Sequence, residues 1–126
     1  MDGARYRRHM GSALAADILD LQVVEHGPDT RVVTVTGELD SLTGPMLAAT
    51  LAAQLETAQI VVVDLDGVQF LASAGLGALF DANEIATRRN RDLRLVCNSP
   101  SANRSLTVSG LREQFTFADS VLNALN

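Results

Sequence analysis

The sequence predicts one α/β domain in which about four α-helices pack on a mixed, mostly parallel sheet of four or five strands opened by a β-hairpin. Three observations predict this class. At 126 residues the chain is long enough for one domain with its own core. Short β-branched runs alternate with segments whose apolar residues recur at helical spacing. The first two runs are joined by a turn, whereas later runs are separated by helices and are therefore expected to be mainly parallel.

The hairpin and the first helix are indicated by turn residues and by leucine spacing. HGPDT supplies Gly, Pro and Asp for the hairpin turn, and GELDSLTGP then forms a loop. In that loop Ser41 or Thr43 is expected to cap a helix, with Pro45 in its first turn. The elements expected up to this point are strands at residues 17–25 and 31–36 and a helix at residues 46–57.

The next strand, at residues 60–65, is a continuous apolar and β-branched run, which indicates burial on both faces. Asp64 and Asp66 are expected to close it before a turn at Gly67. The helix that follows has acidic residues early and arginines late, which complements its dipole. The remaining elements are expected to be a helix at 73–89, a strand at 93–97, a helix at 101–108, a short strand at 115–117 and a helix at 118–125.

Composition and charge exclude several classes of function. The apolar fraction of 47% and charged fraction of 20% are typical of soluble proteins, and no apolar run approaches the roughly 18–20 residues that span a bilayer. A net charge of −5 disfavours direct nucleic-acid binding. The single cysteine, Cys97, excludes an intramolecular disulfide and is expected to be a buried, inert thiol. With no export signal, the protein is expected in the cytoplasm.

The first sixteen residues, MDGARYRRHMGSALAA, are expected to be a disordered leader. Their apolar stretch is too weak for a signal peptide. The folded domain is therefore expected over residues 17–126.

The segment VVVDLDGV has the strand and Asp-x-Asp pattern of the nucleophile motif in haloacid-dehalogenase-type phosphatases. Such an enzyme also needs a cation for the phosphoryl group and further carboxylates for Mg²⁺. The downstream strand ends instead in Asn98, Ser99 and Pro100, and the chain contains no lysine. The missing lysine also argues against a phospho-accepting receiver domain. Asp64 and Asp66 are therefore expected to shape the end of the strand.

Ser73 stands among small residues at the predicted start of a helix, where its oxygen can cap a backbone N–H. The small neighbours leave the hydroxyl accessible to another protein's active site, and a helix N-terminus tolerates a phosphate. A hydrolase nucleophile is disfavoured because the pattern is not Gly-x-Ser-x-Gly. His9, in the leader, and His26, in the hairpin turn, are also poorly placed to act as a base.

The sequence resembles the anti-sigma factor antagonists built on the STAS domain. GELD matches the family's loop after the second strand, which is usually Gly-Glu-Leu/Ile-Asp. VVVDLDGVQFLASAGLGAL matches a strand followed by Asp-Ser-Ser/Thr-Gly-Leu-Gly, and SPSANRSLTVSGL matches Ser-Pro-x-x-x-Arg-x-Leu-x-x-x-Gly-Leu. With the order of elements, the likeness covers residues 17–125.

The resemblance implies a bacterial regulatory protein that binds a kinase-type anti-sigma factor and frees a sigma factor for transcription. The kinase would use ATP to phosphorylate the first Ser of the motif, which is Ser73, and so end binding. A PP2C-like phosphatase would restore the unmodified form. No cofactor, metal, membrane contact or catalysis of its own is expected, and a monomer is the default expectation. The partner-binding residues implied are Glu38, Asp40, Ser73, Ala74, Gly75 and Leu76.

Two positions depart from the family motif. Ala72 stands where the motif has its leading Asp, and Ala74 stands where it has the second Ser or Thr. The first change removes a carboxylate that could contact the kinase or the neighbouring backbone. The alternative is an unswitched STAS adaptor or a nucleotide-sensing module, although the chain lacks a Walker-type Gly-rich loop.

Overall fold

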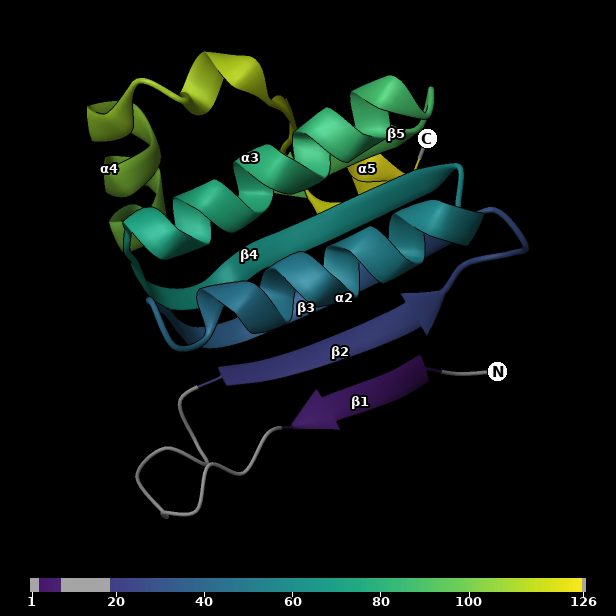
Figure 1. Ribbon diagram of the computed structural model, residues 1–126, viewed down its shortest axis with the longest axis horizontal. Helices are drawn as coiled ribbons and strands as arrows, with labels where there is room; N and C mark the ends of the chain where they lie inside the picture. The colour runs from purple at the N-terminus through teal and green to yellow at the C-terminus, as the bar shows by residue number, and fades with distance from the viewer. Residues whose placement is uncertain (1–2, 8–18, 126) are drawn as a thin grey trace.

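The computed structural model describes residues 3–7 and 19–125, which form a sheet with helices on both of its faces (Figure 1). The described elements are β1 (Gly3–Arg7), β2 (Leu19–Glu25), β3 (Thr30–Leu39), α2 (Gly44–Thr57), β4 (Ile60–Leu71), α3 (Ser73–Arg88), β5 (Asp92–Val96), α4 (Pro100–Ser109), the 3-10 turn η1 (Arg112–Gln114), β6 (Thr116–Ala118) and α5 (Val121–Ala124).

The sheet is mixed and its strands are arranged in the order of the sequence, from β1 to β6. β2 and β3 form the expected antiparallel hairpin, while β3, β4, β5 and β6 are mutually parallel neighbours. The predicted fold class is therefore confirmed, together with its four helices. β1 adds an antiparallel strand beside β2 within the expected leader. The rest of that leader, residues 1–2 and 8–16, lies outside the described residues.

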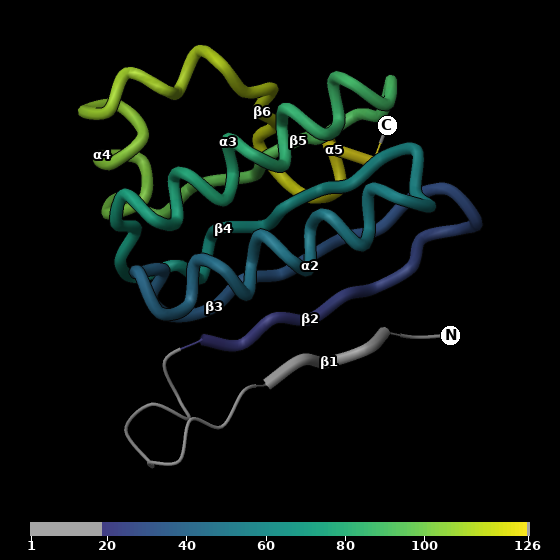
Figure 2. The backbone as a smooth tube through the Cα atoms, viewed as in Figure 1, coloured from purple at the N-terminus to yellow at the C-terminus, as the bar shows by residue number. Residues whose placement is uncertain are grey.

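The core lies mainly between the sheet and the pair of helices α2 and α3, which run along one face (Figures 1 and 2). α2 contributes its three regularly spaced leucines to this core, all fully buried. Successive strand residues face opposite sides of a sheet, so Val61 and Val63 of β4 face α2 and α3. Val62 faces the other side, where it packs with Val96 and Ala124 of α5. This double burial explains the continuous apolar run of β4.

β3 and β4 are longer than the sequence predicts. Their parallel pairing continues past Asp64 to Leu39 and Leu71, so the expected strand end at residue 65 is wrong. Two register shifts place two additional residues in β4, and each shift is a bulge. At the first bulge the Asp64 side chain accepts the N–H of Asp66 at 3.0 Å. The Asp-x-Asp segment thus forms a bulge inside the strand rather than a turn after it.

Two glycines allow α2 and α3 to start close to the sheet and to each other. A Cβ atom on Gly75 would lie 2.7 Å from the Cβ of Leu39 and 2.6 Å from a methyl carbon of Leu71. A Cβ atom on Gly44 would lie 2.9 Å from the carbonyl oxygen of Ala74. Such separations are shorter than van der Waals contact, so a larger residue would force the helix starts apart.

We expect Gly75→Ala to destabilise the domain by roughly 1–3 kcal/mol, because the added methyl group overpacks the contact with Leu39. Gly77 is the matched control, since it lies in the same helix and a Cβ there meets no atom within 4 Å. Gly77→Ala should stabilise by about 0.5–1 kcal/mol through helix propensity alone. Urea midpoints at an unchanged m-value measure both effects. An equal gain in stability from the two substitutions would show that α3 does not approach the sheet this closely.

Candidate functional site

Three helices begin at one end of the sheet. β3, β4 and β5 are parallel and are followed by α2, α3 and α4, so the starts of these helices lie at the carboxyl ends of the strands (Figure 1). Figure 2 shows the chain turning from β4 into α3 at this end. The N–H groups of a first helical turn lack partners within the helix, which makes this end electropositive.

The loop before α2 is held against the start of α3 at both of its ends. The N–H of Ala72 donates to the carbonyl oxygen of Leu39 at 2.8 Å, just before the loop. After the loop, Gly44 packs against the backbone of Ala74. Ser73 lies between these two contacts, so Ser73 and the Asp40 loop lie beside each other.

The Asp40 carboxylate organises this loop. It accepts hydrogen bonds from the N–H groups of Leu42 at 2.9 Å and Thr43 at 3.0 Å. The hydrogen bond from the N–H of Thr43 is the main reason why the pKa of Asp40 lies below its ordinary value. The loop is therefore most stable when Asp40 is ionised.

Thr43 does not cap α2 in the expected manner. It occupies the cap position, but its hydroxyl makes no hydrogen bond to the first turn of the helix. The hydroxyl instead accepts the N–H of Asp40 at 2.9 Å and donates to the carbonyl oxygen of Glu38 at 2.8 Å. A side chain only 3% exposed must satisfy its polar atom inside the fold, and here it does so by closing the loop.

Ser73 is the first helical residue of α3 and its side chain is exposed. The expectation that Ser73 caps the helix is wrong, because Ala72 occupies the cap position in an extended conformation and provides no side-chain hydrogen bond. Within residues 19–125 no hydrogen bond engages the Ser73 hydroxyl. This hydroxyl is therefore accessible and free to react at the start of the helix.

The other predicted partner-binding residues differ in exposure. Glu38 is exposed, and Ala74 is half-buried. Gly75 and Leu76, in the first turn of α3, are buried on the side that faces the sheet. Of the six predicted residues, Glu38 and Ser73 thus present the most side-chain surface.

Two exposed apolar residues near Ser73 were not predicted. Phe70 is 51% exposed and Leu42 is 48% exposed. Phe70 is paired with Glu38 across β3 and β4, while Leu42 lies in the loop held against α3. Phe70 follows the polar Gln69 in the sequence, and simple alternation from Val61 already directs it outward, because the two one-residue bulges together restore the alternation. It was missed because the expected strand ended at residue 65.

Asp66 links β4 to the segment that follows β5. Its carboxylate accepts hydrogen bonds from the backbone N–H of Asn98 at 2.7 Å and from the Asn98 side chain at 3.1 Å. Beside it, the buried Ser99 hydroxyl donates to the carbonyl oxygen of Val68 at 2.6 Å. Partial burial raises the pKa of Asp64. Asp64 and Asp66 therefore have the expected structural role. Asp64 accepts a hydrogen bond within the bulge, and Asp66 is hydrogen-bonded to the segment that follows β5.

No group of three or more His, Cys, Asp or Glu residues suited to a metal ion occurs in the described part of the chain. Cys97 is buried, as expected, and burial raises the pKa of its thiol. Among residues 3–7 and 19–125, no helix combines the length and apolar character needed to cross a membrane.

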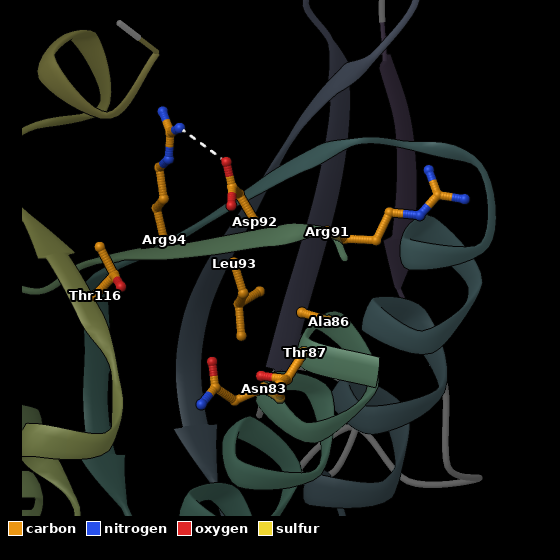
Figure 3. Close-up of a pocket in the computed structure, with 8 residues that line it drawn as sticks. All are labelled: Asn83, Ala86, Thr87, Arg91, Asp92, Leu93, Arg94 and Thr116. Atoms are coloured by element: carbon orange, nitrogen blue, oxygen red, sulfur yellow. Dashed lines mark hydrogen bonds and ion pairs between the residues drawn. The ribbon is translucent and has the colours of Figure 1, made fainter. Parts of the chain in front are cut away.

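A cavity of about 340 Å³ lies far along α3 from Ser73, between that helix and the strands β5 and β6 (Figure 3). Its arginines are already engaged: Arg91 donates to the carbonyl oxygen of Glu56 at 3.2 Å, and Arg94 pairs with Asp92 at 3.2 Å. Figure 3 shows the Arg91 side chain pointing away from Leu93. The cations therefore do not converge on one point, as recognition of a phosphate requires.

A sequence model of the STAS domain matches residues 21–124. The chain belongs to the STAS domain family. This confirms the resemblance drawn from the three sequence motifs. Over 110 residues, this STAS domain is 28% identical to the anti-sigma F factor antagonist of Paenibacillus polymyxa, covering 85% of this chain and 94% of the relative.

Solved structures share the fold of this STAS domain. An anti-sigma factor antagonist from Mycobacterium paratuberculosis is 29% identical, with a TM-score of 0.77 over 86% of this chain and 92% of that chain. The anti-sigma factor antagonist SpoIIAA in its unphosphorylated form has a TM-score of 0.71 at 19% identity, over 83% and 92% of the two chains. The second likeness concerns the fold alone.

We expect Asp40→Asn to lower stability at pH 7, because the amide keeps an acceptor oxygen but loses the charge that the loop N–H groups favour. The folded pKa of Asp40 lies below its ordinary value of 3.8. The stabilisation is therefore complete above that value and is lost as the pH falls through the folded pKa. Urea denaturation of both proteins between pH 7 and about pH 3 should show the difference closing under acid conditions.

Asp64→Asn is the counterpart, with the opposite sign expected. The folded pKa of Asp64 lies above 3.8, so ionisation destabilises the domain as the pH rises from that value through the folded pKa. The amide can still accept the N–H of Asp66, and the variant should be more stable than the wild type at pH 7. If both variants shifted stability in the same direction, the pKa directions assigned here would be wrong.

Proposed function

We propose that this STAS domain is an anti-sigma factor antagonist that binds a kinase-type anti-sigma factor through the surface around Ser73. Binding frees a sigma factor for transcription, and phosphorylation of Ser73 by the kinase ends it. The observation that carries this proposal is the exposed Ser73 hydroxyl at the start of α3, beside the Asp40 loop. The two relatives at 28% and 29% identity, both anti-sigma factor antagonists, support the same role.

The surroundings of Ser73 suit transfer of a phosphoryl group by another protein. The residues on either side, Ala72 and Ala74, have the smallest side chains after glycine, so an active site can approach the hydroxyl closely. Because α3 is packed on the sheet through Gly75 and Leu76, the hydroxyl is presented by a rigid element. A rigidly positioned acceptor lowers the entropic cost of reaching a reactive geometry.

Phosphorylation would act at the surface without refolding the domain. The phosphate adds a charge of about −1.5 to −2 close to Glu38 and Asp40. Burying this charge under a bound partner introduces like-charge repulsion and a desolvation cost. The free N–H groups of α3 stabilise the phosphate locally, so the fold tolerates it. A loss of about 3 kcal/mol in binding is enough to reduce affinity roughly a hundredfold.

The full cycle proposed is regulatory and needs no catalysis by this chain. A PP2C-like phosphatase restores Ser73, and the domain acts as a cytoplasmic bacterial monomer. The net charge of −5 fits a protein that does not bind nucleic acid directly. A phosphatase activity built on Asp64 and Asp66 is not favoured, since both carboxylates are engaged within the fold.

We expect the wild type to gain one phosphate on incubation with ATP and its cognate anti-sigma kinase, which intact-mass measurement would detect. Ser73→Ala should gain none. Ser41→Ala is the matched control, because Ser41 is an exposed serine in the adjacent loop, and it should be phosphorylated like the wild type. Ser73→Glu, which imitates part of the added charge, should bind the kinase about a hundredfold more weakly.

The same experiment distinguishes the alternative. A stable complex that gains no phosphate, and that Ser73→Glu leaves intact, would identify an unswitched adaptor. Tight binding of a labelled nucleotide to the domain alone would identify a nucleotide sensor. Phosphate on the Ser73→Ala variant would place the modification at another residue.

A further inference from the structure

Phe70 and Leu42 are exposed at one end of a domain whose other large apolar side chains are mostly buried. Within the described residues only Val108 on α4 and Leu122 on α5 are comparably exposed large apolar residues. An isolated exposed apolar residue needs no explanation, but neighbouring ones often mark a binding surface.

Phe70 lies three residues before Ser73 and is paired in register with Glu38. The neighbouring pair, Leu39 and Leu71, is buried under α3. Because adjacent strand residues face opposite sides, Phe70 and Glu38 share the face directed away from α2 and α3. They form one apolar and one acidic contact point side by side.

Leu42 is constrained to the same neighbourhood. The loop that carries it is fixed by the hydrogen bond between Ala72 and Leu39 before it and by the packing of Gly44 on Ala74 after it. Within the loop, the N–H of Leu42 is bound by the Asp40 carboxylate. A four-residue loop fixed at both ends beside Ser73 cannot carry Leu42 far from it.

We propose that Phe70 and Leu42 are the apolar anchors by which the anti-sigma factor binds this domain while Ser73 is unmodified. This inference rests on the proposed function. A kinase whose active site reaches Ser73 covers its surroundings, since a stable interface buries about 800 Å² on each partner. Phe70 and Glu38 face the other side of the sheet from α3, but Phe70 is only three residues from Ser73, so an interface of this size extends around the end of the sheet to both. Leu42 falls inside the same contact, because its loop is fixed beside Ser73. The matching partner surface is an apolar depression bordered by a basic side chain that faces Glu38.

In this proposal the apolar anchors and the phosphorylation site have different roles in binding. A few side chains near the centre of an interface supply most of the binding free energy, and large side chains buried in pockets of the partner are common among them. Ser73 contributes little contact area, but its phosphate changes the charge at the interface. Phe70 and Leu42 therefore determine how tightly the unmodified domain binds, and Ser73 determines when it is released.

The test compares Phe70→Ala with Leu122→Ala, the matched control on α5. Both side chains are large, apolar and exposed, so neither truncation should change the urea midpoint by much. Phe70→Ala should weaken binding of the cognate anti-sigma kinase about tenfold or more. It should raise KM for phosphorylation and leave kcat unchanged, because it removes binding without touching the reacting atoms. Leu122→Ala should match the wild type in all three.

Phe70→Leu provides a second variant and should recover part of the affinity, since an apolar anchor needs bulk rather than an aromatic ring. Wild-type affinity in Phe70→Ala, at unchanged stability, would overturn the anchor while leaving the proposed function standing. Equal weakening by Leu122→Ala would also overturn it. A wild-type protein that binds no ATP-dependent anti-sigma factor would instead remove the proposed function, on which the anchor depends.

Discussion

The parallel pairing of β3 with β4 through to Leu39 and Leu71 is the constraint on which the rest of this structure depends. Because Leu39 pairs with Leu71, β3 and β4 end side by side. The loop that leads to α2 and the start of α3 therefore leave the sheet next to each other. The hydrogen bond from Ala72 to Leu39 and the contact of Gly44 with Ala74 are consequences of that alignment. If the pairing stopped at Asp64, the Asp40 loop and the start of α3 would have no fixed relation.

The spacing of apolar residues along the chain was sufficient to predict the class of fold, because burying one face of a helix or both faces of a strand requires apolar residues at characteristic spacings. The apolar run of β4 faces helices on both sides, and α2 shows the leucine spacing of a packed helix. The continuation of β4 was missed since Asp64, Asp66 and Gly67 have the composition of a turn. Their polar groups are satisfied by the bulge itself and by Asn98, which lies 32 residues further along the chain. A partner so distant in sequence cannot be inferred from local composition.

The candidate site was predicted in part, and for reasons that differ between residues. Ser73 and Asp40 were identified through a family motif, and the structure places them together. Phe70 was overlooked because the expected strand ended at residue 65, so the residue was assigned to no face, whereas β4 continues to Leu71. The hydroxyl of Ser73 was expected to cap its helix. An extended Ala72 occupies the cap position instead and leaves that hydroxyl unbonded.

The alternation at the ends of β3 and β4 has an evolutionary consequence. Leu39 and Leu71 face inward and support the fold, whereas Glu38 and Phe70, one position away, face outward. Under the proposed function, mutations at the outward pair alter which partner the domain recognises, with little effect on whether it folds. Duplicated copies within one genome can therefore diverge toward separate partners by exchanging a few surface side chains, so that parallel signalling routes stay insulated from one another.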